Sequence, residues 1–90
     1  MAPRAEPVPV RVECHSGWRG EETPRAILLG QERYEVEEVL DRWYDGGADS
    51  GRPVLRIFRV RLRTGETVLL EQDEGTGAWS LREPLRRRWS

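Results

Sequence analysis

The chain is poor in the residues that build metal sites and disulfides. It has one cysteine, Cys14, and one histidine, His15. One cysteine cannot form a disulfide within the chain or supply a cysteine-rich zinc framework. A carboxylate on the same strand face, such as Glu13 beside His15, would still leave too few ligands for a zinc site. We therefore expect neither a structural metal nor any other cofactor.

Long apolar runs are also missing. No stretch of about 18 apolar residues occurs, so the sequence predicts no membrane-spanning helix and no membrane partner. The residues after Met1 lack the apolar core of a signal peptide. Together with the single cysteine, these features predict a cytoplasmic protein in a reducing compartment.

Lysine is absent, because all fifteen basic residues are arginine, and sixteen acidic residues bring the formal net charge to −1. A nearly neutral chain has no long-range field to attract nucleic acid, so any polyanion binding must come from local clusters. Two explanations for the arginine bias remain open. One is the base composition of the genome, and the other is selection for stacking and bidentate pairing.

Ninety residues are enough for one core only. We expect an arm at 1–7, a single β domain at 8–83 and a basic tail at 84–90. Apolar and polar residues alternate in short segments between glycine-rich turns, which is typical of a small antiparallel β fold. The fold class predicted is all-β, as a five- or six-stranded SH3-like barrel or twisted sheet. The expected strands are 8–15, 25–29, 33–44, 54–63, 66–70 and 78–81, with a long loop at 45–53.

Residues 36–44 fit two kinds of secondary structure. Their apolar residues recur at i, i+3, i+4 and i+7, as in an amphipathic helix. A strand requires a β-bulge at residues 37–38, which returns Tyr34, Val36, Val39 and Trp43 to one side. We favour the bent strand because tyrosine, valine and tryptophan suit strands and no N-cap residue precedes the segment. This interpretation makes Trp43 a core residue, as the regular pattern around it does for Trp79.

The turn after residue 62 determines how the expected strands 54–63 and 66–70 pair. A two-residue turn would set Arg59 opposite Leu70 and mix charge into the apolar face. A three-residue loop at 63–65, with Gly65 left-handed, instead sets Phe58 opposite Leu70 and Val60 opposite Val68. We expect the second register because it keeps one face apolar.

Arginines are clustered in two places that suit a nucleic-acid backbone. Arg59, Arg61 and Arg63 share one strand face at a spacing of about 6.6 Å, near the phosphate repeat of an extended single strand. The tail adds Arg86, Arg87 and Arg88 beside Trp89, an aromatic that can stack on a base. The alternative is that the strand arginines form cross-strand ion pairs with Glu66 and Glu71.

Few residues point to catalysis. Cys14 and His15 are neighbours in an expected strand, where successive side chains face opposite ways, so we do not expect a nucleophile and base pair. The carboxylates are scattered, and an ion-paired solvated face accounts for them more simply than a catalytic pair does. Trp18 and Trp89 lie in a loop and a tail and are the expected partner-binding residues, because exposed tryptophan often anchors interfaces.

Part of the chain resembles a small uncharacterised bacterial domain family. That family is also similar to the C-terminal extension of inactive, Y-family-polymerase-like subunits of a bacterial mutagenesis complex. The likeness spans residues 22–82, mostly at core and turn positions, and it implies an accessory domain linked to DNA repair without catalytic residues. The residues on which the resemblance rests are 22–25, Gly30, 34–43, 58–61, Asp73, Gly77 and Trp79.

Taken together, the sequence favours a non-enzymatic accessory binding module whose partner is single-stranded nucleic acid or a DNA-repair protein. Two alternatives belong to other classes. A protein-interaction adaptor or homodimer would use Trp18 and a strand edge, and a small enzyme would use Cys14 or paired carboxylates.

Overall fold

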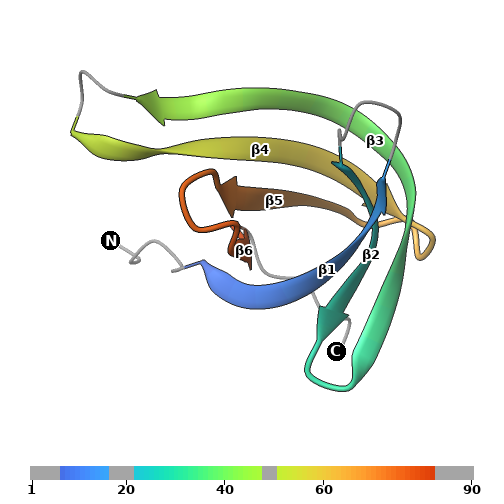
Figure 1. Cartoon of the computed structure of the whole chain (residues 1–90). Helices are drawn as coiled ribbons and strands as arrows, with labels where there is room; N and C mark the ends of the chain where they lie inside the picture. The colour runs from blue at the N-terminus through green and yellow to red at the C-terminus, as the bar shows by residue number, and fades with distance from the viewer. Residues whose placement is uncertain (1–6, 17–21, 48–50, 83–90) are drawn as a thin grey trace, which may run out of the picture.

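The computed structural model describes residues 7–16, 22–47 and 51–82, which form a closed antiparallel barrel (Figure 1). Each strand pairs with the next along the chain, and β6 returns to pair with β1. The expected all-β barrel is therefore confirmed, and among the described residues no helix occurs that is long and apolar enough to cross a membrane. The strands are β1 (Val8–Ser16), β2 (Glu22–Leu29), β3 (Glu32–Gly47), β4 (Arg52–Leu62), β5 (Thr67–Asp73) and β6 (Trp79–Leu81).

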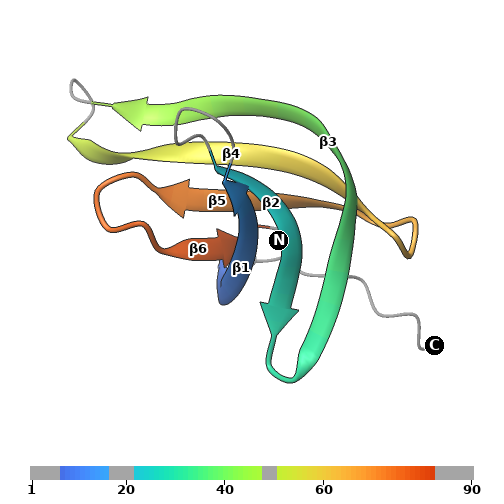
Figure 2. The same cartoon turned by 45° about the vertical axis from the view of Figure 1, so that its right-hand side comes forward.

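β3 is one long bent strand, as expected, and it belongs to both sides of the barrel. Its first residues, 32–35, pair with β2, and residues 36–47 pair with β4. In Figures 1 and 2 the far halves of β3 and β4 run away from β2. The register shifts between Val36 and Glu38, which confirms the predicted bulge.

A second bulge was not predicted, and it corrects the expectation for Trp43. The register shifts again between Val39 and Asp41, so that Arg42 lies opposite Phe58 and Trp43 lies opposite Ile57. Directly opposed residues share a face. One inserted residue therefore turns Arg42 to the side of Phe58 and moves Trp43 to the outer face, where it is 38% exposed.

Several strand boundaries also differ from the predictions, and β5, for example, continues to Asp73 rather than ending at residue 70. β3 continues to Gly47 and β4 begins at Arg52, so the loop between them is shorter than the expected 45–53. β2 begins at Glu22 rather than at residue 25, although it contains Pro24. The register shift in the β1–β2 pair places Arg25 as the extra residue beside Pro24, and bulges are where a sheet tolerates proline.

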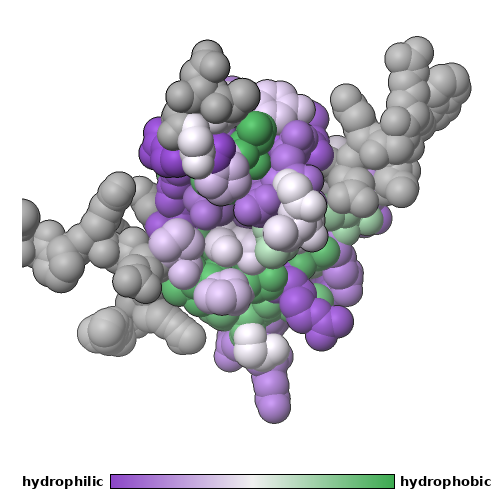
Figure 3. Space-filling view, turned by 60° about the vertical axis from the view of Figure 1, so that its left-hand side comes forward, coloured by the Kyte–Doolittle hydropathy of each residue, from purple (hydrophilic) through white to green (hydrophobic). Residues whose placement is uncertain are grey.

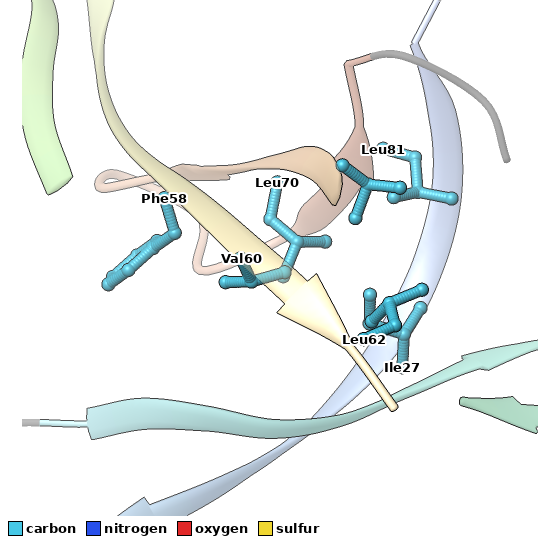
Figure 4. Packing of buried hydrophobic residues seen from close by; sticks show 7 residues of the cluster. Ile27, Phe58, Val60, Leu62, Leu70 and Leu81 are labelled. Atoms are coloured by element: carbon cyan, nitrogen blue, oxygen red, sulfur yellow. The ribbon is translucent and has the colours of Figure 1, made fainter. Parts of the chain in front are cut away.

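The barrel interior is filled mainly from β4 and β5. Phe58 lies opposite Leu70 and Val60 opposite Val68, the predicted register. Figure 4 shows Phe58 at one end of the β4 row, while Leu62 lies at the other end beside Ile27. Trp79 packs against this cluster as expected, and Tyr34, Val36 and Val39 also contact it.

The hairpin between β4 and β5 has the predicted three-residue loop. The Leu62 N–H donates to the Glu66 carbonyl at 2.8 Å, and the Gly65 N–H donates to the Leu62 carbonyl at 2.8 Å. Gly65 has φ 99°, a backbone conformation that favours glycine. The turn therefore sets the register that keeps the inner face of β4 apolar.

Candidate functional site

Arg59 and Arg61 lie on the outer face of β4, as predicted, but they are paired with carboxylates. The Arg61 guanidinium contacts both Glu37, at 3.5 Å, and Glu38. Arg59 lies 3.6 Å from Asp41. Exposed ion pairs contribute little stability, yet here they neutralise the row of positive charge that the sequence suggested as a nucleic-acid surface.

The pairing partners of these arginines come from β3 and not from β5. The sequence predicts Glu66 and Glu71 as the alternative partners, but Glu71 instead accepts a hydrogen bond from Arg82 at 3.2 Å. Arg63 is exposed in the turn after β4. The other predicted binding residues lie outside the described residues: Trp18, Arg86, Arg87, Arg88 and Trp89.

A different pair of arginines lies on the inner face, where the β3–β4 ribbon leaves the barrel. The Cζ atoms of Arg42 and Arg56 lie 5.9 and 5.2 Å from the centroid of the buried Phe58 ring. Such distances are typical of cation–π contacts. Within the described part of the chain, neither guanidinium has a carboxylate at ion-pair distance.

Polar and aromatic side chains extend this inner face across four strands. Tyr44 lies opposite Arg56, Arg56 opposite Gln72, and Gln72 opposite Trp79. Arg56 donates a long hydrogen bond, 3.5 Å, to Gln72 Oε1. The Trp79 ring in turn packs on Phe58 with a centroid separation of 5.5 Å. With Arg42 and Phe58 beside this row, the inner face combines two cations with aromatic rings, of which Tyr44 is the most exposed at 64%.

A pocket of about 240 Å³ opens at these residues, and we call it the Arg42–Arg56 pocket. Figure 3 views the molecule from the side where the β3–β4 ribbon ends and shows a mostly hydrophilic surface in its upper half and an apolar area in its lower half. Ile57 and Phe58, the apolar lining residues of the pocket, are fully buried and do not form this area. A site of this composition can hold an anion between two guanidinium groups and a flat ring against Tyr44. Its lining residues are Arg42, Trp43, Tyr44, Arg56, Ile57 and Phe58.

The acidic residues near this pocket are directed away from it. Asp41 and Asp45 lie opposite Arg59 and Leu55, on the outer face of the ribbon. Asp45 accepts a hydrogen bond from Arg82 at 3.1 Å, and this bond lowers the pKa of the Asp45 carboxyl below its usual value. The carboxylates of β3 are thus engaged on the outside, and the inner face keeps its positive charge.

The Arg42–Arg56 pocket was missed at the sequence level, although one signal was visible. Arg56 precedes Phe58, Val60 and Leu62 in the alternation of β4, so a charged residue falls on the core-facing side of the strand. Arg42 gave no such signal, because its side depends on the second bulge.

Cys14 and His15 are consecutive residues of β1, opposite Pro24 and Thr23. Cys14 is half-buried and His15 is exposed, which fits side chains on opposite faces. Among the residues that the structure describes, no three His, Cys, Asp or Glu side chains gather as a metal ion would require.

Comparison of the chain with family profiles, with curated proteins and with solved structures found no match. We therefore infer the function from the geometry of the Arg42–Arg56 pocket.

Proposed function

We propose that this protein is a non-enzymatic accessory module that binds single-stranded nucleic acid in the Arg42–Arg56 pocket. The observation that supports this proposal is the placement of Arg42 and Arg56 over Phe58, without carboxylate partners among the described residues, beside the exposed Tyr44. Arginine with an exposed aromatic ring is the combination that single-strand binders use, because every base has a face that can stack.

In the proposed complex a backbone phosphate lies between the two guanidinium groups, and an adjacent base stacks on the Tyr44 ring. Arg56 reaches this position with its guanidinium hydrogen-bonded to Gln72, whose amide also donates to the Gly77 carbonyl at 3.4 Å. A duplex keeps its bases stacked inside, so Tyr44 would find no partner there. Single strands should therefore bind more tightly than duplexes of the same length.

The biological setting is also part of the proposal. The resemblance to the extension of mutagenesis-complex subunits supports a role as an accessory domain in DNA repair. The single cysteine supports a reducing, cytoplasmic compartment.

The test is fluorescence anisotropy with labelled single-stranded and duplex oligonucleotides at about 50 mM salt, where phosphate contacts are little screened. The double variant Arg42→Gln/Arg56→Gln should bind at least about tenfold more weakly. Its slope of log affinity against log salt should be shallower by about 0.7, since the two arginines share one phosphate and each phosphate contacted on a single strand contributes about 0.7. The matched control Arg59→Gln/Arg61→Gln removes the same charge from the outer face and should leave affinity within about twofold.

Two results would overturn the proposal. Wild-type protein that shows no binding at concentrations up to about 100 μM, the upper end of ordinary non-specific affinity, would favour the protein-interaction alternative. Equal weakening by the two double variants would show that the Arg42–Arg56 pocket is not the binding site.

A further inference from the structure

The far half of β3 has one edge without a partner strand among the described residues. Residues 36–47 pair with β4 along one edge, whereas pairing with β2 along the other stops at Glu35. Unpaired strand edges can add another strand, and proteins either protect or use them.

Exposed apolar side chains concentrate on this same stretch. Among the described residues, the exposed large hydrophobics are Leu40 at 39%, Trp43 at 38% and Tyr44 at 64%. The β3 edge therefore combines unpaired backbone with apolar surface, which is the composition of an interaction surface.

The direction of each backbone group on this edge follows from the neighbouring hairpin. The Leu62 N–H donates to the carbonyl of Glu66, the residue just before β5. The backbone N–H and C=O groups of successive strand residues point to alternate sides. Those of the even-numbered residues of β4 therefore face β5, and those of the odd-numbered residues, such as Ile57, face β3. Ile57 lies opposite Trp43, so the backbone groups of Trp43 face β4. Those of Arg42 and Tyr44 must then face the unpaired edge.

A side-chain contact agrees with this assignment. The Arg42 N–H donates to Asp41 Oδ1 at 2.8 Å instead of to a carbonyl of β4. The carboxylate of Asp41 thus covers one of the donors on the edge.

We propose that a second copy of this chain pairs with this edge, antiparallel and centred on Trp43. A two-fold interface requires a surface that complements itself, and this register sets Trp43 opposite Trp43 of the partner subunit and Arg42 opposite the partner subunit's Tyr44. Arg42 then exchanges backbone hydrogen bonds with Tyr44 of the partner subunit, and the reverse pair does the same.

The side chains fit this register. Trp43 meets Trp43 of the partner subunit at a non-hydrogen-bonded position, where opposed residues come closest and aromatic pairs stabilise a sheet. The Arg42 guanidinium faces the ring of the partner subunit's Tyr44, a cation–π pair. Asp41 lies opposite the partner subunit's Asp45, but Arg59 and Arg82 already pair with Asp41 and Asp45 within each chain, which offsets their repulsion.

Asp41 opposes this dimer because its carboxylate covers the Arg42 N–H that the partner strand needs. Replacing Asp41 by alanine should therefore tighten the dimer. This direction is unusual for a surface substitution and separates the proposed edge from other modes of association.

Sedimentation equilibrium without nucleic acid tests the proposal, at concentrations from about 10 μM to about 1 mM, the range expected for a small interface. Wild type should show a reversible monomer–dimer equilibrium, and Asp41→Ala should lower the dissociation constant by about 25-fold, the value of two backbone hydrogen bonds, because the Arg42 N–H is freed in both subunits. Tyr44→Pro removes the edge N–H from both subunits without touching the β4 ladder and should dimerise about 25-fold more weakly than Tyr44→Ala, which keeps that N–H.

Monomeric wild type and Asp41→Ala at the highest concentration would overturn the proposal, as would equal dimerisation of Tyr44→Pro and Tyr44→Ala. Circular dichroism reports whether each variant is folded, and if Tyr44→Pro does not fold, Asp41→Ala decides the outcome. Failure of oligonucleotide binding would leave the dimer unaffected, because no nucleic acid is present in this experiment.

Discussion

The guanidinium of Arg33 lies 2.8 Å from the carboxylate of Glu13, which joins β3 to β1 across the intervening strand β2. The same guanidinium lies 2.8 Å from Glu35. Ala26 of β2 lies opposite both Glu13 and Glu35 and is fully buried. The hydrogen bond from Arg33 lowers the pKa of the Glu35 carboxyl below its ordinary value of 4.5.

This network predicts that acid destabilises the protein. A carboxyl whose pKa is lower in the folded state stabilises the fold above its ordinary pKa, and that contribution is lost as pH falls through the folded value. Glu35 and Asp45 both have lowered pKa values. The urea concentration at the midpoint of unfolding should therefore decrease as the pH is lowered from about 5 to about 3. Arg33→Gln should make this decrease smaller.

A matched control for the acid prediction is Arg11→Gln, since Arg11 is exposed on β1 and has no ion pair among the described residues. This control should keep the wild-type dependence on pH. If the urea midpoint of Arg33→Gln depends on pH as strongly as that of wild type, the network does not contribute to acid sensitivity.

Replacing Gly65 should destabilise the fold through its backbone conformation alone. Its φ is 99°, and a Cβ at this position would meet no atom within 4 Å. Gly65→Val should lower the free energy of unfolding by about 1 kcal/mol or more, because a β-branched residue tolerates positive φ poorly. Gly65→Asn should cost less, since asparagine enters this region more readily. Urea denaturation measures both, and Gly65→Val as stable as wild type would contradict the assignment of the turn.

Replacing Gly46 should destabilise the fold more than replacing Gly65, because Gly46 has both a positive φ and a close steric contact. Its φ is 85°, and a Cβ would overlap the carbonyl oxygen of Pro53 on the facing strand. Gly46→Ala should lower the free energy of unfolding by about 2 kcal/mol or more, against about 1 kcal/mol for Gly65→Ala, which meets no steric contact. Equal losses in the two variants would mean that the ribbon end relaxes around the added methyl group.

Local pattern was enough to predict much of the barrel. The alternation in β4, with Gly65 after it, gave the register of Phe58 and Val60, because in a hairpin the turn and the apolar face act on the same few residues. The bulge at residues 37–38 could be predicted for the same reason, since Val36 and Val39 must both face the core. These features depend on interactions between residues close in sequence.

The candidate site depended instead on contacts between strands whose pairing the sequence does not specify. Glu66 is near Arg61 in sequence, yet Glu37 and Glu38 pair with it, because β3 lies along the other edge of β4. The second bulge inserts one residue into β3, and side chains alternate with a period of two. That single residue reverses the faces of Arg42 and Trp43, so only the folded barrel brings Arg42 together with Arg56 and leaves Trp43 on the outer surface.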